Sequence, residues 1–124
     1  MPIGIRLLTV SDAPQGRDIL VTTMNDVPGY RVVAVLGEVM GLTVRSRNIG
    51  SQLGAGLKAL AGGELKGMTR NLYTSRREVV DRMLDEARAL GANAVVAMRF
   101  DTSELGQTWT EICAYGTAAR IEPV

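Results

Sequence analysis

The stretch that decides the fold runs from Ser75 to Gly91 and reads SRREVVDRMLDEARALG. Its apolar residues recur at intervals of three and four and share one broad face, which comprises Val79, Val80, Met83, Leu84, Ala87 and Leu90. This spacing is typical of an amphipathic helix that packs one side against a core. Ser75 and Glu78 have capping-box spacing, and Gly91 suits the residue that follows a helix end. We therefore predict a helix that begins between Lys66 and Arg76 and ends before Gly91.

Two strands are predicted after this helix. The first covers Ala94 to Phe100, and the polar residues 101–107 then form a turn. The second is a long final strand from Trp109 to Ile121. Because side chains alternate between the two faces of a strand, one face of this final strand carries Trp109, Glu111, Cys113 and Tyr115.

The residues before the helix also predict strands. Ile19 to Thr23 is rich in β-branched residues, and Pro28 with Gly29 suits the centre of a type II turn. Tyr30 to Leu36 is a nearly continuous apolar run, which indicates a strand covered on both faces. A second apolar run follows it and ends near Arg45.

Glycines shape the segment between these strands and the Ser75 helix. Gly37 and Gly41 interrupt the second apolar run, which predicts a bend or a bulge there. An apolar stripe at offsets of four, four and three then predicts another helix, formed around Ile49, Leu53, Leu57 and Leu60. Asn48 suits its N-cap, and Gly62 with Gly63 suits its end. Three glycines inside this helix cost about 1 kcal/mol each relative to alanine, so we expect a neighbouring element or subunit to approach its backbone closely.

Strands that flank two central helices give an α+β fold in one small domain. The 124 residues, 46% of them hydrophobic, suit a single globular core. No apolar run reaches the roughly 18 residues of a membrane span, and a net charge of +1 gives no electrostatic reason to bind nucleic acid. We therefore predict no membrane or nucleic-acid partner. One cysteine without a disulfide partner favours the reducing cytoplasm.

Cys113 is the obvious soft metal ligand, and it is the only cysteine in a chain that has no histidine. A lone cysteine among apolar neighbours is more often a small buried hydrophobe. A metal site would need carboxylates such as Glu111 or Asp101, or cysteines from symmetry-related subunits. We predict no cofactor, and Cys113, Glu111 and Asp101 are the candidates for a metal site.

A second candidate site lies where the second apolar run meets the first predicted helix. Arg45, Arg47 and Asn48 surround that helix N-terminus, a position that can bind an anion, although helix capping and exposed arginines explain the same residues. We predict that Arg47 pairs with an acidic side chain such as Glu64, in its own or a neighbouring subunit, or with a bound anion. No catalytic residue is predicted, because histidine bases are absent and no two carboxylates stand out as an acid and a base.

Three stretches together resemble a known family. They read VPGYRVVAVLGEVMG (residues 27–41), RSRNIGSQLGAGLKALAGGELKGMT (45–69) and EARALGANAVVAMRFDTSELGQTWTEICAYGTAARI (86–121). The chain resembles the bacterial YbjQ family over about residues 19–123, so we expect an N-terminal extension at 1–17 and a YbjQ-like domain at 18–124. The resemblance implies an α+β subunit in a dodecin-like β/α ring, typically a pentamer. It also implies a heavy-metal-binding label without an established reaction.

Together these observations predict a cytoplasmic homo-oligomer with a structural or small-ligand-binding role, whose partner is itself. One alternative is a heavy-metal-binding protein that uses Cys113 and carboxylates. Another is an enzyme with an active site at a subunit interface, although the residues favour a non-enzymatic role.

Overall fold

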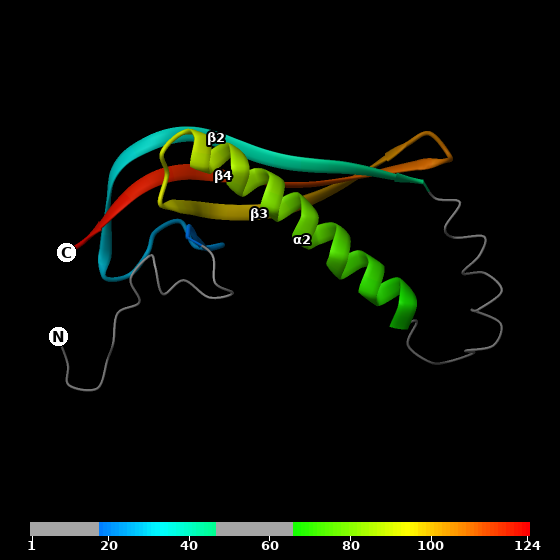
Figure 1. The fold of residues 1–124 in the computed structure, drawn as a ribbon, viewed down its shortest axis with the longest axis horizontal. Helices are drawn as coiled ribbons and strands as arrows, with labels where there is room; N and C mark the ends of the chain where they lie inside the picture. The colour runs from blue at the N-terminus through cyan, green and yellow to red at the C-terminus, as the bar shows by residue number, and fades with distance from the viewer. Residues whose placement is uncertain (1–17, 47–65) are drawn as a thin grey trace.

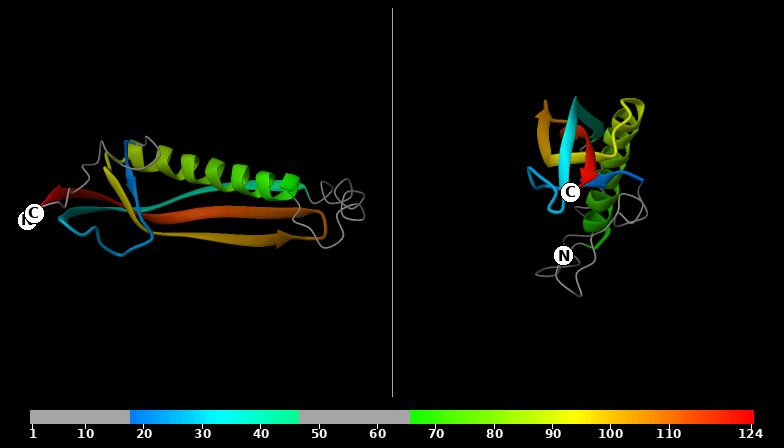
Figure 2. Two further views of the ribbon diagram at one scale, coloured as in Figure 1. Left: turned by 90° about the horizontal axis from the view of Figure 1, so that it is seen from below. Right: turned by 90° about the vertical axis from the view of Figure 1, so that its left-hand side faces the viewer.

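The computed structural model describes residues 18–46 and 66–124. In chain order these residues form β1 (Leu20–Val21), β2 (Tyr30–Ser46), α2 (Lys66–Ala89), β3 (Ala94–Leu105) and β4 (Trp109–Pro123). The three long strands make an extended ribbon, and α2 lies along one side of it (Figures 1 and 2). The protein is therefore a small α+β domain with a helix packed on a mixed sheet, as the sequence predicts.

The sheet has the strand order β1-β3-β4-β2. β4 lies in the middle of the ribbon and runs antiparallel to both β2 and β3. β1 pairs in parallel with only the start of β3, through Leu20↔Ala94 and Val21↔Val95. β2 is consequently an edge strand along its whole length.

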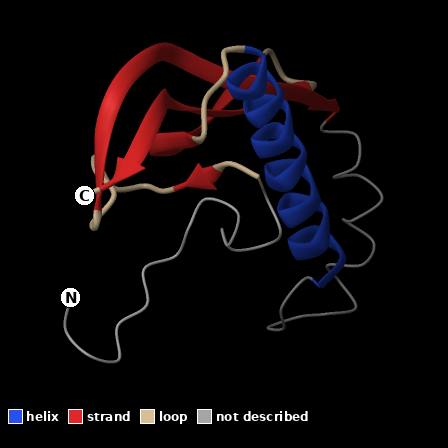
Figure 3. Ribbon diagram, turned by 60° about the vertical axis from the view of Figure 1, so that its left-hand side comes forward, coloured by secondary structure: helices blue, strands red, loops and turns tan. Residues whose placement is uncertain are grey.

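The apolar face of α2 forms the centre of the core, which confirms the main sequence prediction. Val79, Met83 and Ala87 are fully buried, and Val80 and Leu84 are nearly so. They pack over residues of β2 and β4 in one apolar cluster, and Figure 3 shows the helix against one side of the strands. The sixth predicted member of this face, Leu90, is 47% exposed because it follows the last residue of the helix.

The two ends of α2 compare differently with the prediction. At the C-terminal end, Gly91 adopts φ 81°, and the Ala92 and Gly91 amides donate to the Ala87 and Arg88 carbonyls. These two bonds close the helix as a glycine C-cap does. At the N-terminal end, the helix begins at Lys66, which is the early limit of the predicted range, so Ser75 is a buried residue inside the helix and not its cap.

Two central helices are predicted, and the described part of the chain contains one. The predicted first helix, with its apolar stripe and its internal glycines, lies outside the described residues, as does the predicted N-terminal extension. The described residues therefore match one of the two predicted helices.

Glycines act in two different ways along β2. At Gly37 the pairing with β4 shifts register and φ is 134°, which confirms the predicted bulge. At Gly41 the register is continuous, so the bulge lies at Gly37 and not at Gly41. A Cβ atom at Gly41 would instead overlap the Val79 carbonyl and the Met83 amide of α2. Gly41 is thus the point where the helix backbone rests on the strand.

The hairpin that follows α2 is longer than predicted. β3 extends to Leu105, and only residues 106–108 form the turn, so the polar stretch after Phe100 is strand and not loop. Its backbone pairs continuously with β4 from Arg99↔Tyr115 to Leu105↔Trp109. Ladder hydrogen bonds outweigh the low strand propensity of these polar side chains.

Two further predictions concern the first strands. The type II turn is confirmed, because the Tyr30 amide donates to the Val27 carbonyl and Gly29 has φ 86°. The prediction that residues 30–36 are covered on both faces is wrong for the subunit. β2 is an edge strand with bulges in this region, and it leaves Val32, Val33 and Val35 exposed at 42%, 47% and 71%.

Candidate functional site

The sheet face opposite α2 carries the side chains that the sequence marks as chemically interesting. Gly41 and Ala114 are cross-strand partners beneath the helix, so by alternation their neighbours Leu42 and Cys113 point to the other face. The register extends this assignment over three strands. We call this surface the open face, and it consists of Glu38, Met40, Leu42 and Val44 of β2, Tyr115, Cys113, Glu111 and Trp109 of β4, and Arg99, Asp101, Ser103 and Leu105 of β3.

The open face has an apolar side and a charged side. Met40, Leu42 and Val44 form an apolar column on β2 and are 39% to 45% exposed, whereas Val39 and Thr43 between them are buried against the helix. The β3 column begins with Arg99 and continues with Asp101 and Ser103. Two large apolar side chains, Leu105 and Trp109, complete the face next to the hairpin turn and are 44% and 49% exposed.

Cys113 lies in the middle of the open face, between Leu42 and Asp101. It is 8% exposed, as expected for a small buried hydrophobe. Burial raises the pKa of the thiol, and the negative charges of Glu111, Asp101 and Glu38 raise it further. The thiol therefore stays protonated at neutral pH, whereas metal ions bind the thiolate.

The three metal candidates share this face, but they do not form a metal site within one subunit. Asp101 is the direct cross-strand partner of Cys113, and Glu111 lies one row further along β4. Among residues 18–46 and 66–124, no three histidine, cysteine, aspartate or glutamate side chains come close enough together to hold a metal ion. One protonated thiol with two carboxylates is also a poor donor set for a soft metal.

Arg45, predicted as part of an anion site, forms an ion pair with Glu78 of α2. Glu78 also accepts a hydrogen bond from Arg82 at 2.7 Å. This pairing ties the end of β2 to the helix. Glu64 is the predicted partner of Arg47, and Arg47, Asn48 and Glu64 all lie outside the described residues. The predicted pairing of Arg47 therefore stays a prediction.

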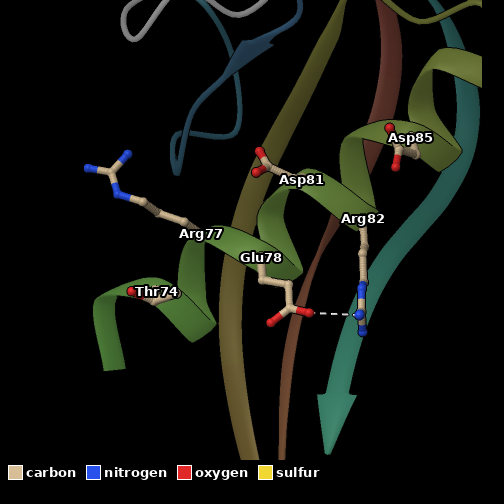
Figure 4. A pocket seen from close by; sticks show the side chains of 6 residues that line it. All are labelled: Thr74, Arg77, Glu78, Asp81, Arg82 and Asp85. Carbon is tan, nitrogen blue, oxygen red and sulfur yellow. Dashed lines mark hydrogen bonds and ion pairs between the residues drawn. The ribbon is translucent and has the colours of Figure 1, made fainter. Parts of the chain in front are cut away.

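The outer surface of α2 has a shallow depression, drawn in Figure 4, lined by Thr74, Arg77, Glu78, Asp81, Arg82 and Asp85. The Glu78–Arg82 pair there has side chains 31% and 50% exposed. Ion pairs in contact with water contribute little to stability. This depression is a solvated charged surface, as its four-residue charge spacing indicates.

One role of these charged helix residues could not be predicted from the sequence. The Met40 amide donates to the Glu86 carboxylate at 3.3 Å, and the Arg82 guanidinium donates to the Leu42 carbonyl at 2.7 Å. Both backbone groups belong to the outer edge of β2. Which charged residue of α2 reaches the edge of β2 depends on how the helix is aligned with the strand. The spacing of residues along the sequence does not predict that alignment.

The comparisons with known proteins agree with one another. A family model described as "Putative heavy-metal-binding" matches residues 19–122. A protein named "UPF0145 protein" from Acidothermus cellulolyticus is 63% identical over 103 residues, covering 83% of this chain and 95% of the relative. A "UPF0145 protein" from Streptomyces griseus is 60% identical, covering 86% of this chain and 88% of the relative.

The relatives are not restricted to bacteria, which corrects the expectation of a bacterial family. The "UPF0145 protein PTO0347" of the archaeon Picrophilus torridus is 50% identical, covering 86% of this chain and 91% of the relative. A crystal structure of a protein of unknown function from Pediococcus pentosaceus matches with a TM-score of 0.55 at 13% identity. It covers 86% of this chain and all of that chain, and the likeness concerns the fold alone.

Among the described residues, α2 is the one helix, and it is too polar to cross a membrane. The matched range includes β1, β2, α2, β3 and all of β4 except Pro123. With the family model over residues 19–122 and relatives at 63% and 60% identity, the chain belongs to the YbjQ family, whose members carry the name UPF0145.

Proposed function

We propose that this protein works as a homo-oligomer in the cytoplasm, with a structural or small-ligand-binding role that the isolated subunit cannot perform. The observation that carries the proposal is the exposure of Val32, Val33 and Val35 on both faces of β2. A strand that is apolar on both faces is the pattern of a strand covered on both sides. Within one subunit that cover is incomplete.

The free energy gained by covering these valines supports assembly. Full burial of a valine side chain stabilises by roughly 1.5–3 kcal/mol, so covering three half-exposed valines would contribute about 3 kcal/mol. The open face adds a second apolar surface with Met40 and Trp109 at its two ends. Contiguous exposed apolar surface on a small protein marks an interaction site.

The ligand-binding part of the proposal rests on what the open face would become in an assembly. Covering this face with another subunit would create an enclosed site that contains Trp109, Tyr115 and a protonated thiol. Such a site would suit an apolar or aromatic small molecule, because ligand pockets are mostly apolar with a few polar groups. For the stoichiometry we propose the pentameric ring that the family resemblance implies.

The assembly is tested by light scattering coupled to size exclusion at micromolar concentration, together with native mass spectrometry. A subunit has a mass of 13.3 kDa, and we expect a discrete species of several subunits, with five as the proposed number. A clean monomer at these concentrations would contradict the proposal. Native spectra of protein purified from its own host would also reveal a retained small molecule as extra mass.

Heavy-metal binding is the second candidate, and one observation favours it: Cys113, Asp101 and Glu111 all point to the same open face. Ligands from two or more copies would then be needed to complete a site. Metal analysis after chelator washing tests this candidate. Stoichiometric zinc or copper that is retained by the wild type and lost in Cys113→Ala would favour it over the structural role of the thiol.

A further inference from the structure

The N-terminal half of α2 is built differently from the half that forms the core. From residue 66 to residue 77 the sequence KGMTRNLYTSRR contains no acidic residue, and the first turn has none. In Figures 1 and 3 this half of the helix runs away from the strands. Leu72 and Tyr73 are accordingly 51% and 65% exposed.

Arg70, Tyr73 and Arg77 lie on one side of this half, because they are spaced by three and four residues. All three are exposed, and we call them the basic ridge. Residues 66–77 contain no carboxylate that could neutralise the two arginines within this half of the helix. The ridge is therefore complementary to a negatively charged surface.

The open face is such a surface. Asp101, Glu111 and Glu38 outnumber its single Arg99. After burial, the negative charges of these three carboxylates are the cause that raises the pKa of the Cys113 thiol between them. Next to these carboxylates stands the apolar column of β2, with Leu42 43% exposed. A tyrosine flanked by two arginines matches this combination, and tyrosine and arginine are enriched among the residues that contribute most to binding at interfaces.

The ridge cannot reach the open face of its own subunit, because α2 packs against the opposite face of the same sheet. We propose that the basic ridge of one copy docks on the open face of a second copy, with Tyr73 on the apolar column and Arg70 and Arg77 near Asp101 and Glu111. The contact joins two different surfaces of identical chains. Repeating it around an axis closes a ring without using a two-fold interface.

This inference rests on the proposed homo-oligomer and names the surfaces that hold it together. The test reverses the charges on each side. The ridge variant Arg70→Glu/Arg77→Glu and the face variant Asp101→Arg/Glu111→Arg should each raise the concentration at which the assembly dissociates by about 100-fold, because like charges then meet across the contact. The combined four-residue variant should recover most of the wild-type assembly.

The matched control for the ridge variant is Arg82→Glu/Arg88→Glu, which makes the same change of net charge at exposed arginines of α2 outside the ridge, the open face and the valines of β2. It should assemble as the wild type does. Circular dichroism checks that each variant keeps its fold, and light scattering over a dilution series measures assembly at 50 mM and 500 mM salt. The wild-type assembly should weaken at the higher salt, since screening shortens the reach of these charges.

The outcomes separate this inference from the proposed function. A monomeric wild type would overturn both. An oligomeric wild type whose ridge and face variants assemble normally would overturn this inference alone. Disruption by both single-side variants without recovery in the combined variant would also contradict direct contact between the two surfaces.

Discussion

The two faces of the sheet are packed differently. The face under α2 carries small residues where the helix comes closest: Gly41, Ala114 and Ala118 are all buried. The open face has large side chains at the corresponding positions, among them Met40 and Tyr115, and several of them are nearly half exposed. The helix-covered face is therefore complete within one subunit, and the open face has the composition of an interface that one subunit leaves unfilled.

The largest effect should come from truncating a core side chain under the helix. Met83 is fully buried, and Met83→Ala should lower the free energy of unfolding by about 3 kcal/mol because it leaves a cavity. The matched variant on the other face is Met40→Ala. In the monomeric state, urea denaturation should show that Met40→Ala lowers the free energy of unfolding by less than about 1 kcal/mol. A comparable loss of stability in both variants would mean that the two faces are equally packed.

The next effect concerns the close approach of the helix to β2. A methyl group at Gly41 would overlap backbone atoms of α2, so Gly41→Ala should destabilise by about 2 kcal/mol through a forced shift of the helix. Gly67→Ala is the control, because a Cβ atom there meets nothing within 4 Å. Its replacement inside a helix should stabilise by up to about 1 kcal/mol. Thermal melting measures the change in stability of each variant. The close-contact argument requires the two changes to have opposite signs.

A smaller effect tests the electrostatics of the open face. Burial and the neighbouring carboxylates raise the pKa of the Cys113 thiol, so its reaction with a thiol reagent should be slow in the native protein and fast after unfolding. Glu111→Gln removes a negative charge, which should lower the pKa of Cys113 and increase the native rate at pH 8. Glu122→Gln is the control and should leave the rate unchanged. Rapid modification of the wild-type thiol would show that Cys113 is an accessible nucleophile.

The smallest effect lies at the rim of the helix-covered side. Arg88 holds Asp18 through two hydrogen bonds of 2.8 Å and lowers the pKa of that carboxyl. Since the folded pKa lies below the unfolded value, this contribution is present above the usual pKa of aspartate and is lost as the pH falls through the lowered one. Asp18 is exposed, so solvent screens most of the effect. The difference in melting temperature between wild type and Asp18→Asn should therefore shrink as the pH falls below about 4.

The sequence could predict those features that depend on a local periodic pattern. The three-and-four spacing identified the buried face of α2, and the alternation in β4 placed Glu111 and Cys113 on one face. Gly91 was recognisable as a helix end because its backbone conformation is nearly specific to glycine. These features depend on neighbours within a turn of helix or along one strand.

What the sequence could not predict depends on contacts between distant segments. The pairing of Arg45 with Glu78 requires the alignment of β2 against α2. The Ser75 capping box has the right local pattern, but the helix continues for nine residues before it, and no local rule forbids that. The position of Asp101 in a strand beside Cys113 follows from the hairpin register, which residue types in 101–107 alone do not determine.

The hydrogen bonds that Glu86 and Arg82 make to β2 also bear on aggregation. An exposed strand edge is a template on which other chains can add without limit, and natural proteins protect such edges with charges or bulges. Here two charged side chains occupy the backbone groups of Met40 and Leu42, and two register shifts distort the strand before Gly37. An incoming strand would have to displace charge-assisted hydrogen bonds in one half of β2 and straighten bulges in the other. The subunit can thus expose valines for specific contacts and still resist growth into fibrils.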